Sequence, residues 1–118
     1  MKADATPLRI AVWQCEQRPG EVAGNLARLR AAAQRAAAAG AQLLVTPEML
    51  LTGYNIGADA AQRLAEPADG PRAQAVAALA RELGLAIVFG HPERDGAGAV
   101  FNTVQAVDAR GRVIGHYR

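Results

Sequence analysis

The stretch Leu43–Tyr54, LLVTPEMLLTGY, contains a short apolar run, a proline, one acid and a second apolar run that ends at a Thr-Gly turn. Its first three residues have the aliphatic composition of a buried strand. Glu48 follows, and the carboxyl ends of strands are where ligands bind in α/β sheets. A lone acid among apolar neighbours costs free energy unless it is paired. Glu48 is therefore either a structural acid, which caps a helix or pairs with an arginine, or a positioned general base, and the pattern alone leaves both open.

The segments before this stretch alternate between strand and helix patterns. Leu8–Gln14 is apolar almost throughout, which predicts a strand that is covered on both faces. A helix is expected from Glu21 to Ala39, because apolar residues recur there at helical spacing. A second strand is expected over Gln42–Val45. Two strands joined by a helix form a β-α-β unit, so these two strands should be parallel.

The remainder of the chain predicts helices first and then strands. A short helix is expected over Ala58–Leu64, and a longer one from Pro71 to Leu83, ended by Gly84. Three strands should follow, of which the last two form an antiparallel hairpin; they are Leu85–Gly90, Val100–Val107 and Val113–Tyr117. The order β-α-β-α-β-β-β, apart from the short helix, predicts an α/β fold, and residues 1–118 amount to a single domain.

Composition argues against several classes of protein. The net charge is +2, the basic residues are scattered singly and aromatic residues are few, so no nucleic-acid partner is expected. No apolar run approaches ~18 residues, which predicts that no segment spans a membrane. The first residues, Met1–Pro7, lack an apolar signal core, and the single cysteine, Cys15, suits a reducing compartment. These features together predict a cytoplasmic protein.

Few other side chains suit catalysis. The chain contains no serine, which excludes nucleophilic catalysis by serine. Its only lysine, Lys2, lies in a terminal segment, so this chain cannot complete a mechanism that needs a buried lysine. Cys15 is interpreted as a packed, structural thiol, because no cationic residue closely precedes it. His91 is interpreted as a loop or supporting residue. His116 has no neighbours at metal-ligand spacing, so no metal site is predicted.

Several motifs in a fixed order resemble the nitrilase superfamily, the carbon–nitrogen hydrolases. Thr46–Tyr54 is similar to that family's glutamate motif. The family's opening is resembled by Leu8–Gln14 together with Pro19-Gly20-Glu21 and Asn25-Leu26. Other positions that fit the family pattern are Gly90, Glu93, Asn102, Asp108, Gly111 and Tyr117-Arg118. The resemblance therefore extends over essentially the whole chain, from Leu8 to Arg118.

The resemblance implies the N-terminal half of an α-β-β-α sandwich enzyme, so that this chain is one truncated domain and a partial sandwich. The family uses a Glu-Lys-Cys triad without a metal or organic cofactor. By resemblance, Glu48 is the catalytic general base and Tyr54 lies near the substrate. The family's lysine directly follows a segment like Tyr117-Arg118 and its cysteine comes later, so both are expected beyond the end of this chain.

The resemblance also implies a small-molecule substrate, namely an amide, a nitrile or a carbamoyl compound, and amides are favoured because amidases are the broader part of the family. We expect this chain alone to be inactive and the complete enzyme to be a homo-oligomer. The alternative is a non-catalytic α/β scaffold or interaction module. As an isolated half of the family's sandwich, the chain should expose a sheet edge and an apolar sheet face.

Overall fold

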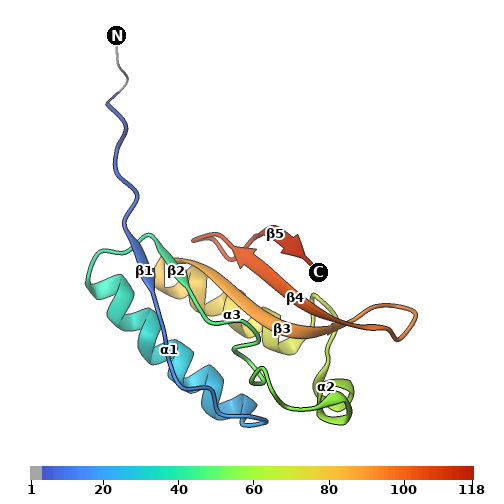
Figure 1. The fold of residues 1–118 in the computed structure, drawn as a ribbon. Helices are drawn as coiled ribbons and strands as arrows, with labels where there is room; N and C mark the ends of the chain where they lie inside the picture. Colours follow the sequence, from blue (N-terminus) through green and yellow to red (C-terminus); the bar gives the residue numbers. More distant parts are fainter. Residues whose placement is uncertain (1–3) are drawn as a thin grey trace.

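The computed structural model describes residues 4–118, which form one five-stranded sheet and three helices (Figure 1). The strands are β1 Ile10–Val12, β2 Leu43–Val45, β3 Ala86–Arg94, β4 Val100–Val107 and β5 Val113–Tyr117. The helices are α1 Val22–Ala38, α2 Ala58–Leu64 and α3 Pro71–Leu83. In the sheet the strands lie in chain order; β1, β2 and β3 are parallel, and β3, β4 and β5 are antiparallel. The predicted α/β fold, the parallel pair and the hairpin are confirmed.

Three strands differ in length from the prediction, and the second, Leu43–Val45 instead of Gln42–Val45, differs by one residue. The first strand is Ile10–Val12 instead of Leu8–Gln14, because β2, the strand that pairs with it within residues 4–118, offers three residues for pairing. The third strand continues past Gly90 to Arg94, because β4 pairs with it along its whole length. The predicted helices were nearly correct, since α2 has the expected bounds and α3 begins at Pro71. Lys2 lies outside the described residues.

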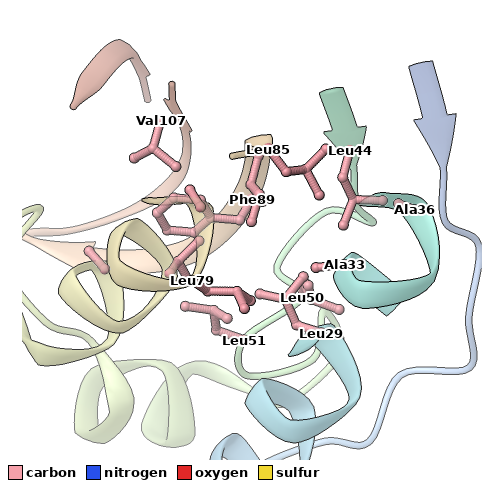
Figure 2. Close-up of a cluster of buried hydrophobic side chains, with 14 residues drawn as sticks. Leu29, Ala33, Ala36, Leu44, Leu50, Leu51, Leu79, Leu85, Phe89 and Val107 are labelled. Atoms are coloured by element: carbon pink, nitrogen blue, oxygen red, sulfur yellow. The ribbon is translucent and has the colours of Figure 1, made fainter. Parts of the chain in front are cut away.

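The hydrophobic core lies between one face of the sheet and the two long helices, as Figure 2 shows. Alanines on α1 and α3 let these helices approach the sheet closely, where Leu44, Ile87 and Phe89 project toward them. Leu50 and Leu51, from the loop after β2, are also fully buried in this cluster. Burial of each leucine contributes on the order of 2 kcal/mol, so the loop that follows β2 is anchored in the core.

The opposite face of the sheet has no covering element among residues 4–118. Ile10 and Val12 are 49% and 69% exposed there, so the prediction that the first strand is covered on both faces is wrong for this structure. Tyr117, on β5, is 75% exposed on the same face, next to Val104 on β4. This open face is therefore an apolar surface that the described chain leaves in contact with solvent.

The length and polarity of the helices bear on whether any of them could span a membrane. Within residues 4–118, every helix is too short or too polar to cross a lipid bilayer.

Candidate active site

The loop after β2 carries Glu48 and is fastened to β3 on both sides of that residue. Before Glu48, the main-chain N–H and the hydroxyl of Thr46 both donate to the carbonyl of Val88, at 3.2 and 2.8 Å. After it, the N–H of Leu51 donates to the carbonyl of Gly90 at 3.3 Å. Glu48 is thus held at the carboxyl end of a parallel strand, the position at which α/β sheets bind ligands.

The residue after Glu48 has an unusual backbone conformation. Met49 has φ of 53°, in the left-handed region that side chains other than glycine rarely adopt. Such a conformation costs on the order of 1 kcal/mol and persists only where the surroundings enforce it. The N–H groups of Thr52 and Gly53 both donate to the carbonyl of Met49, at 3.2 and 2.8 Å, and the burial of the two following leucines offsets the strain.

The reversal at Met49 separates the acid from its apolar neighbours. Met49, Leu50 and Leu51 are buried, whereas the side chain of Glu48 is exposed on the open face of the sheet. The apolar residues that follow Glu48 in the sequence therefore face the core, and Glu48 faces away from it. Neither structural role considered for Glu48 is seen among residues 4–118, since it caps no helix and forms no ion pair with an arginine.

Glu48 borders a hollow of about 500 Å³ on the open face, which we call the Glu48 hollow. The residues that line it include Val88, Gly90, Val104 and Tyr117. The Glu48 carboxylate accepts a hydrogen bond of 2.6 Å from the side-chain amide of Asn102, on β4. The site therefore contains the carboxylate of Glu48, which is held by a hydrogen bond at one oxygen and remains accessible to solvent.

The sequence identified Asn102 only as a position in a pattern and gave it no role. Its contact with Glu48 joins residues 54 positions apart and depends on how β4 pairs with β3. The alternation of buried Thr103 and exposed Val104 along β4 is the signal that places Asn102 on the open face. Because β4 pairs with β3, and β3 pairs with β2, a side chain on this face of β4 can reach the loop after β2.

The structure leaves the predicted role of Tyr54 without direct support. Tyr54 lies at the far end of the loop, its side chain is 59% exposed, and it is not among the residues that line the Glu48 hollow. A contact between this ring and a substrate stays a prediction. Cys15 packs against the core as a partly buried residue, in agreement with its interpretation as a structural thiol.

The two histidines both lie in the sheet. His91 is buried in β3 instead of lying in a loop, because the strand continues to Arg94, and its Nε2 is 2.5 Å from the side-chain oxygen of Gln105. His116, on β5, pairs with Glu93 at 2.6 Å. Among residues 4–118, no three His, Cys, Asp or Glu side chains gather closely enough to hold a metal ion.

A buried carboxylate, that of Glu93 on β3, binds side chains from β4 and β5 and the residue that follows β5. Its side chain is 4% exposed and accepts hydrogen bonds from Thr103 (2.8 Å), His116 (2.6 Å) and Arg118 (2.8 Å). The guanidinium of Arg118, with help from the other two donors, outweighs burial and lowers the pKa of Glu93 to about 2. Arg118 also stacks over the ring of Phe101 at 4.3 Å. The end of β5 is therefore fixed where it lines the hollow.

Replacement of Glu93 by glutamine should lower the free energy of unfolding at pH 7 by about 2 kcal/mol, because it removes the charge that Arg118 and His116 face. The pKa of Glu93 is about 2 in the folded protein and 4.5 ordinarily, so the contribution of the charge is complete above pH 4.5 and is lost as the pH falls toward 2. Urea unfolding of both proteins at pH 7 and pH 3 checks this, and the difference should shrink at pH 3.

The matched control for this substitution is Glu82→Gln. Glu82 pairs with Arg30 on the surface, where both side chains are about half exposed, so its loss should cost less than about 0.5 kcal/mol at either pH. A cost for Glu93→Gln that is equally small, or that does not change with pH, would contradict the structural importance of the Glu93 charge.

Comparison with known proteins places these features in a family. The family model described as carbon-nitrogen hydrolase matches residues 9–118. The relative named "Hydrolase in pqqF 5'region", from Pseudomonas protegens, is 50% identical over 111 residues, which are 94% of this chain and 38% of that protein. A nitrilase from Pyrococcus abyssi is 32% identical over 94% of this chain and 42% of its own length. This chain thus spans about two fifths of the length of these relatives.

Solved structures agree with the sequence comparison. An amidase from Nesterenkonia sp. matches with a TM-score of 0.76 and 30% identity, over 94% of this chain and 42% of that chain. Variants of the amidase from Nesterenkonia sp. AN1 have been solved in complex with butyramide, and with acrylamide added at the active site cysteine. Since the family model extends over residues 9–118 and the backbone matches that of a nitrilase-superfamily amidase, the chain belongs to the carbon–nitrogen hydrolase family.

Proposed function

We propose that residues 1–118 are one truncated domain, the N-terminal part of a thiol amidohydrolase that cleaves a non-peptide C–N bond in a small amide, nitrile or carbamoyl compound. The observation that carries the proposal is the placement of Glu48. Its carboxylate lies at the carboxyl end of β2, beside a hollow of about 500 Å³, and is held there by Asn102. A general base has to reach the proton that it removes, and this carboxylate is both positioned and accessible.

In the proposed reaction, Glu48 takes the proton of a cysteine thiol that residues outside this chain supply. The thiolate then attacks the carbonyl carbon of the amide, and a lysine ammonium, also from outside the chain, stabilises the negative charge on oxygen. The tetrahedral intermediate expels the amine, which takes up the proton held by Glu48, and a thioester remains. Glu48 then removes a proton from water, which attacks the thioester, and a carboxylic acid and the thiol are released.

The choice of amides as the substrate class rests on the relatives. The Nesterenkonia amidase is described in complex with butyramide and with a covalent adduct at its active site cysteine. Those descriptions support a cysteine nucleophile and a small acyl group for the complete enzyme to which this chain is proposed to belong. The expected homo-oligomer is likewise proposed for that complete enzyme from the family resemblance.

We expect the 118-residue chain alone to release no ammonia from small amides, nitriles or N-carbamoyl compounds. The physical reason is that a carboxylate near neutral pH has no thiol to activate in the Glu48 hollow, since Cys15 packs against the core instead. The test compares this chain with one extended by the natural downstream sequence, assayed for ammonia release on the same panel of compounds. Activity of the short chain would contradict the need for outside residues.

The extended chain also decides between the proposal and its alternative. Ammonia release by the extended chain from at least one small amide supports the hydrolase. An extended chain that folds and is inert on the whole panel would favour a non-catalytic scaffold, in which Glu48 and Asn102 serve only to hold the loop after β2.

A further inference from the structure

The main chain of Glu48 is held by a second residue, Gln17, in the loop between β1 and α1. We propose that Gln17 is a positioning residue, which orients the peptide group of Glu48 and thereby aims its carboxylate into the Glu48 hollow. This inference rests on the proposed role of Glu48 as the general base. It assigns no contact between Gln17 and a substrate.

The side-chain amide of Gln17 connects both ends of the loop that bears Glu48. Its Nε2 donates to the carbonyl of Glu48 at 2.5 Å, and its Oε1 accepts from the N–H of Tyr54 at 2.7 Å. Only one orientation of the amide satisfies both contacts, because the reverse orientation sets oxygen against oxygen and N–H against N–H. A side chain at position 17 therefore has to offer a donor and an acceptor together.

Gln17 is itself carried by a well-anchored segment. The N–H of Gly20 donates to the carbonyl of Thr52 at 2.8 Å. The side-chain amide of Asn25, only 1% exposed, donates to the carbonyls of Arg18 and Leu51 at 3.0 and 3.2 Å. These contacts join the same two loops without using Gln17. Its removal should therefore leave the loops together and free only the peptide group of Glu48.

That peptide group is the point at which the chain reverses. The carbonyl of Glu48 directly precedes Met49, whose φ of 53° turns the following residues into the core. Rotation of this peptide swings the side chain of Glu48 relative to the sheet. Gln17 restrains the main chain and Asn102 restrains the carboxylate, so the acid is held at both ends. A displacement of about 1 Å at a reacting group is enough to lower a rate by about 10²-fold.

The test uses Gln17→Glu in the extended chain that shows hydrolase activity. Glutamate keeps the acceptor for the N–H of Tyr54 but replaces the donor to the Glu48 carbonyl by an oxygen. We expect kcat for a small amide to fall about 10- to 100-fold, with KM changed less than about threefold and the melting temperature nearly unchanged. Gln17→Met keeps the length of the side chain and removes both hydrogen bonds. It should likewise lower kcat and leave KM nearly unchanged.

The control is Gln34→Glu, an exposed position on α1 with the same change of charge, which should leave both constants unaltered. If kcat is retained in both Gln17 variants while Glu48→Gln abolishes activity, the positioning role is wrong and the base assignment stands. If Glu48→Gln is itself active, the proposed role of Glu48 as the general base fails and the role of Gln17 fails with it. The inference is also overturned if the loss of kcat in the Gln17 variants is no larger than the fraction of unfolded protein explains.

Discussion

Glu48→Gln, introduced into the extended chain that shows hydrolase activity, should lower kcat by about 10³-fold and change KM by less than about threefold. Glutamine matches the size of glutamate and keeps an oxygen to accept the hydrogen bond from Asn102, so the loop should stay in place. It cannot take a proton from the thiol at neutral pH. Steady-state release of ammonia from a small amide, measured over a range of concentrations, gives both constants.

The matched control is Glu16→Gln, which makes the same change at an exposed acid in the loop between β1 and α1. It should leave kcat within about twofold of the starting protein. Retention of more than a tenth of the activity in Glu48→Gln would show that Glu48 is not the general base. The acid would then be structural, and another group would have to supply the base of the reaction.

Gly90→Ala should destabilise the protein by about 3 kcal/mol, near the upper end of the usual cost of overpacking. A Cβ atom at position 90 would lie 2.5 Å from the main-chain nitrogen of Met49 and 3.3 Å from its Cα. Both are backbone atoms that cannot rotate away, so the loop bearing Glu48 would have to leave β3. Urea unfolding of the extended chain measures the loss, and the hydrolase activity should fall with it.

Gly96→Ala provides the control for this substitution. Gly96 lies in the loop between β3 and β4, where an added Cβ meets nothing within 4 Å. The free energy of unfolding should change by less than about 1 kcal/mol, with a small gain from the reduced entropy of the unfolded chain. If Gly90→Ala costs as little as Gly96→Ala, the close approach of β3 and the loop is not a requirement of the fold.

The success of the sequence prediction depended on how local each signal was. The helices α2 and α3 were predicted almost to the residue, because helical periodicity, Pro71 at the start and Gly84 at the end are all properties of neighbouring residues. Strand lengths depend on the partner strand, which explains the errors in β1 and β3. The α/β class could be predicted from the alternation of strand and helix patterns alone.

The candidate site was only partly predictable for the same reason. Glu48 was a candidate from its place after a strand and received its role from the family resemblance. Its exposure follows from the left-handed conformation of Met49, which no rule of residue preference assigns to methionine. Gln17 and Asn102 reach Glu48 across 31 and 54 positions of the chain. Such contacts become visible only when the register of the sheet and the path of the loops are known.

The order of the strands has a consequence for the way this protein is made. Each strand after β1 pairs with the strand that precedes it in the chain, so every strand that emerges from the ribosome finds its partner already outside. The sheet can therefore grow in the direction of translation, and N-terminal parts generally fold first. Glu48, Gln17 and Asn102 come together once β4 has joined the sheet. The residues that position the proposed base thus all precede, in the chain, the residues proposed to supply the nucleophile.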